Sequence, residues 1–433
     1  MIVVPRSNRE ESSMRLVRWA SAAAVAVLVA SVLVPSPAGA WAATVSSSGV
    51  PLPNGVYPGQ AGYQSAGYYQ YAPSVVQTSN TQRIIYYCAN RVAYDRDAGN
   101  AVAATHDHVL FNVGTRQSNG SYTWGSTQVA LRPRLSPGDP NYHPATPSWS
   151  AYHICDPEVV RGSFTYTTPQ TGQRTYTWAM FFTGADNDDG GADGRFNVVG
   201  VALATAPTGP WTIVGTPIID VTEPDYNPSG YGVGQPSVTS VDGQGNMLLF
   251  YSGLDCRALD APDPTCNGLD RGTAVRTLDL GNANAPVLGA RSFVTTAGLT
   301  PEPYLPNSGR FLHNASWTYD ASRDVFFISR DTGALDGNEV QANVEVDRIP
   351  GVNIWAGGGT WTVVGQITSA QTGYRWNHNS GLVRDAYGGL AYQRPGDYSG
   401  VDVYFATEPG TGSTPPPWDG YFAYRMQRST SAL

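Results

Sequence analysis

The stretch GQPSVTSVDGQGNMLLFYSG, residues 234–253, holds two strand-like segments on either side of a turn. The first segment starts at Gln235-Pro236. The segment VDGQG, 241–245, has the glycine and aspartate content typical of a tight hairpin turn. The segment NMLLFYSG that follows is a short apolar run, as expected for a buried strand. The stretch therefore predicts an antiparallel hairpin.

Similar stretches recur along the chain and decide the predicted fold. They start at Asp156, Gln235, Asn314 and Asn379, with two equal intervals and a shorter third one, and further strand-like segments follow each start. Helical periodicity is nearly absent. Repeated four-stranded units without helices predict the blades of a β-propeller, and an earlier unit over 81–147 brings the count to five. We therefore predict an all-β, five-bladed β-propeller over residues 81–433. A pair of β-sandwiches is the alternative, and it explains the repeated strand order less well.

The region before residue 81 differs in composition from this repeated region. A 16-residue apolar run, Trp19 to Val34, follows a basic start and precedes two small-x-small sites that end at Ala40 and Ala42. This order predicts a secretory signal peptide over 1–42. A membrane anchor is the alternative, but the run is short for a span. Residues 43–80 are rich in Gly, Pro and Tyr and predict an arm or linker. We expect a secreted protein that is not held in a membrane after cleavage.

Charge and composition exclude several classes of function. The net charge is −8 and only 14% of residues are charged, which argues against nucleic acid and anionic membranes as partners. The chain contains no lysine, so lysine Schiff bases, pyridoxal chemistry and P-loop phosphate binding are excluded. Aromatic residues make up 11% of the chain. Their faces suit carbohydrate, although they are also ordinary sheet and core residues.

Four cysteines in an exported chain predict two disulfide bonds, and three pairings are open. Cys256 and Cys266 bracket a short segment, RALDAPDPT, which indicates a closed loop. Their pairing would leave Cys88 with Cys155, directly before Asp156.

The propeller model predicts where functional side chains gather. If the first strand of each blade starts at one face of the axis, then Asp156, Gln235, Asn314 and the pair His378-Asn379 surround that axis. Asp156 precedes Pro157, which favours an extended backbone at Asp156. We expect the substrate-binding residues to lie around this axis; this set is Gln235, His313, Asn314, Trp317, His378 and Asn379.

One unit resembles a known family. The segments DPEVV (156–160), YTWAMFFTGADNDD (176–189) and NVVGVALATAPTGPWTIVGTPIID (197–220) are similar to a blade of the five-bladed propeller glycosidases of family 43, the arabinanases, β-xylosidases and related furanosidases. The resemblance implies a propeller and an inverting hydrolysis of a glycosidic bond. It assigns the Asp before Pro, Asp156, as general base.

The resemblance also implies an acid in each of the next two blades, but here those positions carry Gln235 and Asn314. An inverting reaction needs a second carboxyl group about 6.5–9.5 Å from the first. Glu302, on a loop expected to reach the same face, is our candidate for the general acid. Glu158 lies on the same strand face as Asp156 and is a further candidate. Its alternative role is to pair with a buried arginine.

We therefore predict a secreted glycoside hydrolase that acts on a polysaccharide or oligosaccharide containing arabinose or xylose. A carbohydrate-binding propeller without catalysis is the alternative, and a surface scaffold is a weaker third. We assign no metal ligand and no cofactor. The loop ADNDDGGADG, 185–194, is rich in oxygen ligands and would suit Ca²⁺, although its spacing differs from that of a calcium-binding loop.

Overall fold

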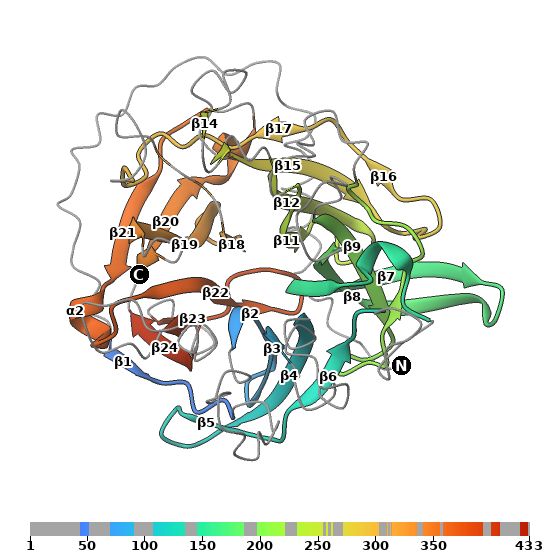
Figure 1. Ribbon diagram of the computed structural model, residues 1–433, viewed down its shortest axis with the longest axis horizontal. Coiled ribbons are helices and arrows are strands. Elements are labelled where there is room, and N and C mark those ends of the chain that lie inside the picture. Colours follow the sequence, from blue (N-terminus) through green and yellow to red (C-terminus); the bar gives the residue numbers. More distant parts are fainter. Residues whose placement is uncertain are drawn as a thin grey trace, which may run out of the picture.

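A computed structural model shows that the described part of the chain is mainly β-strand, with little helix (Figure 1). Among the described residues, no helix has the length and apolar character needed to cross a membrane. The predicted signal peptide, 1–42, lies outside these residues. The structure describes residues 44–51, 70–90, 107–134, 145–185, 197–220, 232–253, 257–258, 261–262, 272–302, 310, 312, 314–335, 341–355, 358–392, 400–407 and 425–431.

The sheets lie around a common centre (Figure 1). In the second, third and fourth sheets along the chain, the first strand is the innermost and its neighbours are antiparallel, which is the order predicted from the repeats. The second sheet contains β7 (His153–Thr168), β8 (Gly172–Ala185), β9 (Val198–Ala204) and β10 (Thr212–Ile213). The third contains β11 (Gly234–Ser240), β12 (Asn246–Gly253), β15 (Gly272–Asp279), β16 (Val287–Leu288) and β17 (Ser292–Phe293), with the short pair β13 (Arg257–Ala258) and β14 (Ala261–Pro262) separate from it. The fourth contains β18 (Ser316–Asp320), β19 (Val325–Leu335), β20 (Gln341–Pro350) and β21 (Thr362–Ile367).

The two ends of the described chain meet in a nine-stranded sheet. Its two antiparallel groups are joined by a parallel pair, β2 with β22, in which Val75 lies opposite Val383. β1 pairs with β24, so the first described strand completes the last group. One group contains β2 (Tyr71–Ser79), β3 (Gln82–Asn90), β4 (Asp107–Arg116), β5 (Tyr122–Trp124) and β6 (Gln128–Leu131); the other contains β22 (Asn377–Asp385), β23 (Val401–Thr407), β24 (Arg425–Ser431) and β1 (Thr44–Ser47).

Two predictions about the region before residue 81 need correction. Residues 43–80 were expected to form an arm, but β1 and β2 belong to the nine-stranded sheet. β2 is also the innermost strand of its group, so this unit begins before residue 81, where its start was expected. The Gly, Pro and Tyr content of the region hid the strand YAPSVVQTS, 71–79, which is buried along its middle.

The core lies between neighbouring sheets. β9 and β23 are buried at every position, because each is covered on both faces. One apolar cluster joins Phe181 and Val201 of the second sheet to Val238 and Leu249 of the third. Full burial of such side chains stabilises the fold by about 1.5–3 kcal/mol each. Within the described ranges, the helical segments are single turns: η3 (Ser148–Ser150), η6 (Gly351–Ile354) and α2 (Ser369–Thr372).

Candidate functional site

A pocket lies at the centre of the fold, where the innermost strands begin. Its walls come from β2, β7, β11 and β22 and from the residues that lead into β18. The residues predicted to surround the axis all line this pocket, and we call them the ring residues: Asp156, Gln235, Asn314 and Asn379. The lining residues are Ala72, Pro73, Asp156, Pro157, Glu158, Gln235, Pro236, Ser237, Asn314, Ala315, Ser316, Asn379 and Ser380.

The same ring has an unusual backbone conformation. Six non-glycine residues of the described chain have positive φ, and five of them line this pocket. The left-handed conformation costs an L-residue roughly 1–2 kcal/mol, so the surrounding structure must enforce it at each position. The five residues and their φ values are Ala72 (48°), Asp156 (49°), Gln235 (50°), Asn314 (51°) and Asn379 (47°).

The expectation of an extended backbone at Asp156 is therefore wrong. The preference set by Pro157 is overridden by a bulge in the strand pairing. The register between β7 and β8 shifts between Cys155 and Glu158, and the innermost strands β2, β11 and β22 shift at the matching place. A bulge bends a strand and redirects a side chain. Here it brings the residue with positive φ to the pocket.

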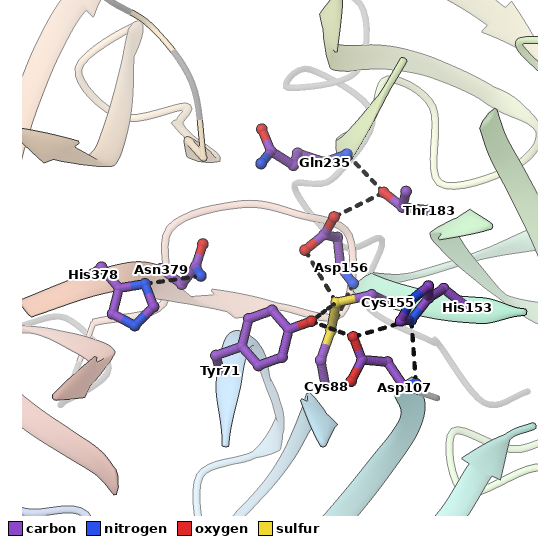
Figure 2. The surroundings of a disulfide bond; sticks show 10 residues. All are labelled: Tyr71, Cys88, Asp107, His153, Cys155, Asp156, Thr183, Gln235, His378 and Asn379. Carbon is purple, nitrogen blue, oxygen red and sulfur yellow. Dashed lines mark hydrogen bonds and ion pairs between the residues drawn. A yellow bond between two sulfur atoms is a disulfide. The ribbon is translucent and has the colours of Figure 1, made fainter. Parts of the chain in front are cut away.

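Asp156 is held on two sides (Figure 2). Its backbone N–H donates to Sγ of Cys88 at 2.8 Å, and the hydroxyl of Thr183 donates to its Oδ2 at 2.8 Å. Cys88 and Cys155 form a disulfide bond with Cα atoms 5.2 Å apart, as predicted. Asp156 remains partly exposed. The pocket therefore contains a carboxyl group with a fixed position and access to solvent. Cys256 and Cys266, the other predicted pair, lie outside the described residues.

The disulfide is itself packed against polar side chains (Figure 2). The hydroxyl of Tyr71 lies 3.1 Å from Sγ of Cys155 and donates to Asp107 Oδ2 at 2.5 Å. His153 Nδ1 lies 3.3 Å from the same carboxylate oxygen. Tyr71 immediately precedes Ala72, so this contact connects β2 to the strand that carries Asp156.

Hydrogen bonds link the ring residues to one another. The backbone N–H of Gln235 donates to the Thr183 hydroxyl at 2.8 Å, and Oε1 of Gln235 accepts the backbone N–H of Asn314 at 3.0 Å. Nδ2 of Asn314 donates to Oδ2 of Asp331 at 3.2 Å. The backbone N–H of Asn379 also donates to Asp331. A continuous series of contacts therefore runs around the pocket from Asp156 to Asn379.

Glu158 lines the pocket, but its carboxylate is paired with a buried arginine. Its carboxylate pairs with Arg384 and accepts a hydrogen bond from the Ser237 hydroxyl at 2.6 Å. Arg384 also donates to the carbonyl oxygens of Val159 and Val238 at 3.2 and 2.9 Å. Burial raises the pKa of Glu158, and Arg384 partly offsets this. The alternative given for Glu158, pairing with a buried arginine, is confirmed.

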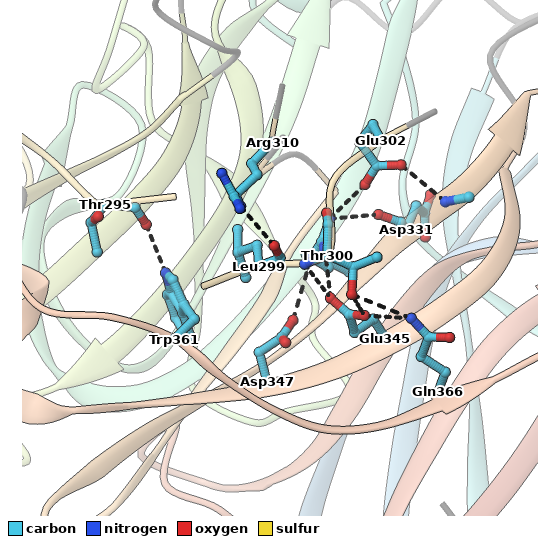
Figure 3. Close-up of polar contacts among 12 residues, drawn as sticks. Thr295, Leu299, Thr300, Glu302, Arg310, Asp331, Glu345, Asp347, Trp361 and Gln366 are labelled. Carbon is cyan, nitrogen blue, oxygen red and sulfur yellow. Dashed lines mark hydrogen bonds and ion pairs between the residues drawn. The ribbon is translucent and has the colours of Figure 1, made fainter. Parts of the chain in front are cut away.

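Glu302 does not occupy the open position expected for it (Figure 3). It is fully buried, accepts from Arg330 Nη1 at 2.8 Å and from the Gly333 N–H at 2.9 Å, and is absent from the described pocket lining. Arg330 also pairs with Glu345 at 2.6 Å and Asp347 at 3.3 Å. Burial raises the pKa of Glu302. The structure gives this residue a place in a buried ionic cluster, and its role as general acid stays a prediction.

Two other expected ligand-binding residues also differ from their predicted placement. Trp317 is buried in the apolar core and stacks on Phe250, with ring centroids 4.1 Å apart. It follows Ser316, which lines the pocket, and neighbouring strand residues point to opposite faces. His378 is buried beside Asn379, with its Nδ1 3.0 Å from that amide nitrogen. Burial lowers its pKa to about 3. His313 lies outside the described residues.

Sequence reasoning missed two residues of this region. Ala72 is the ring residue of β2, and the signal was the repeated X-Pro step, seen in Ala72-Pro73 as in Asp156-Pro157. Asp331 ends a segment, FFISRD, that reads as an ordinary strand. Its side chain is 3% exposed, and burial raises its pKa to about 7. No metal-ligating set apart from the disulfide neighbourhood is found in the described part of the chain. The acidic loop lies outside that part from residue 186.

Comparisons with known proteins support a fold assignment. No protein-family model matches the sequence. No curated protein matches it either. Among solved structures, the GH43_1 enzyme from Xanthomonas citri complexed with xylotriose superimposes with a TM-score of 0.50 at 13% identity, over 98% of this chain and 93% of that one. The same enzyme complexed with xylose gives 0.50 at 12% identity, over 98% and 93%. A family 117 glycoside hydrolase of the marine bacterium Zobellia galactanivorans gives 0.49 at 14%, over 91% and 90%.

The fold is therefore the one seen in these propeller glycoside hydrolases, and the structural likeness extends over nearly the whole chain. At these identities the likeness concerns the arrangement of strands. The chemistry of this chain has to be argued from its own residues.

Proposed function

We propose that the protein is an exported five-bladed propeller that hydrolyses a glycosidic bond in an oligosaccharide or polysaccharide. The blade count treats the nine-stranded sheet as two blades that meet at the parallel pair β2–β22. The ring of positive-φ residues supports this count, because each blade would then contribute one residue to it. Export rests on the apolar run and the cleavage sites within 1–42.

One observation carries the proposed reaction: Asp156 is a partly exposed carboxyl group, fixed in position at the wall of the central pocket. A carboxylate in this position can accept a proton from water as the water attacks the anomeric carbon, while the glycosidic C–O bond breaks and the leaving oxygen takes a proton from solvent. General base catalysis of this kind contributes about 10²–10⁴-fold in rate. The hydrogen bond from Thr183 orients Oδ2. The other oxygen of Asp156 is the atom that we assign to the water.

The neighbouring ring residues suit a sugar. Gln235, Asn314 and Asn379 offer amide groups, which can donate to and accept from hydroxyl groups. The structurally similar enzyme from Xanthomonas citri was solved with xylotriose and with xylose. We therefore propose pentose-containing glycans, built from xylose or arabinose, as the first substrates to test. The reaction itself needs no cofactor; Ca²⁺ in the loop 185–194 remains a separate proposal.

A specific observation favours a second candidate, carbohydrate binding without hydrolysis. The ring positions of the other blades carry Ala72, Gln235, Asn314 and Asn379, none of which can serve as a general acid. Glu158, the second carboxyl group of the described lining, is paired with Arg384. The two proposed functions use the same pocket and the same kind of ligand. They differ only in whether the bound sugar is hydrolysed.

The experiment is a screen of purified protein against arabinan, arabinoxylan, xylo-oligosaccharides and aryl furanosides, with Asp156→Asn beside the wild type. Hydrolysis predicts that this variant loses turnover by at least about 10²-fold and keeps most of its sugar affinity, since the amide preserves shape but cannot take a proton. Asp242→Asn, in the hairpin between β11 and β12, is the matched control and should behave as the wild type. Equal turnover by Asp156→Asn would remove Asp156 from the mechanism. Binding without turnover by the wild type would establish the second candidate.

A further inference from the structure

Three of the ring residues are held by side chains from the second strand of a neighbouring group. Cys88 of β3 accepts the backbone N–H of Asp156, and Thr183 of β8 accepts that of Gln235. Asp331 of β19 accepts that of Asn379. In the first two cases the accepting residue lies opposite the residue that precedes the positive-φ position, as the pairs Tyr71–Cys88 and Cys155–Thr183 show. Each contact fixes the next ring residue along the chain.

Asp331 is chemically different from the other two. A neutral side chain is sufficient to hold a backbone N–H, as Thr183 demonstrates. Asp331 and Thr183 are both 3% exposed, and at this burial a carboxyl group carries a larger desolvation cost than a hydroxyl group. Its Oδ1 is buried and has no hydrogen-bond partner among the described residues. The need to accept a backbone N–H therefore does not explain why an aspartate stands at position 331.

Asp331 also contacts a side chain of the pocket. Its Oδ2 accepts Nδ2 of Asn314 at 3.2 Å, so the carboxylate determines which end of this amide faces away from the pocket. Asn314 and Asn379 both line the pocket and come from neighbouring innermost positions. Asp331 thus contacts two ring residues from behind, as Thr183 does for Asp156 and Gln235. Unlike Thr183, it brings an ionisable group to this place.

We propose that Asp331 is a positioning residue of the central site, which fixes the Asn314 amide and the Asn379 backbone so that both meet a bound sugar in one orientation. The inference rests on the proposed sugar-handling function and deepens it. It assigns to Asp331 no direct contact with substrate.

The ionisation of Asp331 gives this arrangement a measurable signature. Burial raises its pKa to about 7, hydrogen bonds from Asn379 and Asn314 lower it, Glu302 raises it and Arg330 lowers it. His378, beside Asn379, stays neutral in the range tested because burial lowers its pKa to about 3. A carboxylate only accepts hydrogen bonds, whereas a carboxylic acid also donates one. Protonation of Asp331 therefore changes the hydrogen-bonding partner of the Asn314 amide from a pure acceptor to a group that can also donate.

The test compares wild type, Asp331→Thr and Asp331→Asn. Asp331→Thr introduces the residue type that Thr183 provides at the matching place in β8. Ser252→Thr is the control, because Ser252 lies opposite Gly234 at the matching place in β12, while the Asn314 N–H is accepted by Gln235. Affinity for xylotriose and for arabinoxylan is measured by calorimetry at pH 5.5 and 8.5. In parallel, the side-chain amide signal of Asn314 is followed by NMR in protein labelled with ¹⁵N-asparagine and assigned with Asn314→Ser.

In the wild type we expect affinity to change between the two pH values and the Asn314 signal to titrate near pH 7. Both Asp331 variants should lose the titration and about tenfold in affinity at pH 8.5, the loss expected for one hydrogen bond to a charged group. Ser252→Thr should retain the titration of the Asn314 signal and the wild-type affinity.

Wild-type affinity in Asp331→Thr at both pH values, or an Asn314 signal in the wild type that does not move with pH, would overturn the inference. If Asp331→Thr does not fold, the near-isosteric Asp331→Asn decides. Absence of sugar binding by the wild type would instead overturn the proposed function, and the amide signal would then decide the role of Asp331 alone.

Discussion

Asp156 is attached to Cys88 twice: its backbone N–H donates to the Cys88 sulfur at 2.8 Å, and the residue before it, Cys155, is covalently bonded to that same sulfur. The two contacts link neighbouring sheets and meet at the residue with φ of 49°. This relationship explains how a strained backbone persists at the pocket. It also connects chain stability to the geometry of the proposed base.

We expect the double substitution Cys88→Ser/Cys155→Ser to lower the free energy of unfolding by about 2–5 kcal/mol, as for other native disulfides. Sugar affinity should fall with it, because Asp156 loses its covalent neighbour. Thermal unfolding and calorimetric binding measure the two effects. The pair Cys256→Ser/Cys266→Ser provides a comparison distant in sequence. Unchanged stability and affinity in the Cys88/Cys155 variant would contradict this account.

Thr183→Val should impair the site more than it impairs the fold. The hydroxyl of Thr183 both donates to Asp156 and accepts the Gln235 N–H, and valine has the same shape without either group. Removing a hydrogen bond to a charged partner costs about 1.5–3 kcal/mol. We expect turnover or affinity to fall by at least tenfold, while Thr183→Ser stays near the wild type. A serine variant as impaired as the valine variant would show that packing, and not the hydroxyl, matters.

Glu158→Gln should destabilise the protein strongly. It leaves the guanidinium of Arg384 buried without its anionic partner, and breaking a buried ion pair in this way costs about 3–5 kcal/mol. The double variant Glu158→Gln/Arg384→Met removes both charges and should recover part of the loss. Denaturant unfolding of the three proteins tests the coupling. Additive losses in the double variant would mean that the pair is not a unit.

The stability of the protein should decrease as pH rises toward 7 because of Asp331. Its folded-state pKa, about 7, is above the ordinary value of 3.8, so the folded state binds the proton more tightly than the unfolded state does. Its contribution is full below pH 3.8 and is lost as pH rises to about 7, at no more than about 1.4 kcal/mol per pH unit. Asp331→Asn cannot titrate, so its stability relative to the wild type should improve over this range. A constant difference from pH 4 to pH 8 would rule this out.

The repeat explains why much of the ring could be predicted from sequence. Gln235 and Asn314 stand at the starts of successive equivalent stretches, and equivalent positions of a repeat occupy equivalent places in space. Ala72 stands before a proline, as Asp156 and Gln235 do, but a small apolar residue in a Gly- and Pro-rich region carries no chemical signal. The backbone at Asp156 could not be predicted, because its conformation is set by a bulge that depends on pairing with β8.

The remaining misplacements concern which way a side chain points. Glu302 lies between prolines and reads as an exposed loop acid, yet it is directed at Arg330, a residue 28 positions away. Trp317 and Ser316 are neighbours on one strand and point to opposite faces. The sequence does not show which of these faces is directed toward the pocket. Asp331 follows the apolar half of β19, and nothing in the sequence distinguishes it from a surface residue. These features arise from contacts between segments distant in the chain, which a single sequence does not specify.

The pairing of β1 with β24 has a consequence for how the chain is made. Ser48, just after β1, donates to the carbonyl oxygen of Met426 at 2.7 Å, although 378 residues separate them. During synthesis the first strand emerges long before its partner exists, and contacts this distant in sequence form slowly because their loop closure is unfavourable. Until the last strand arrives, β24's neighbour β23 presents an unpaired sheet edge, a known route to aggregation. Export in an unfolded state would suit such a chain, since both ends then reach the same compartment before the sheet is completed.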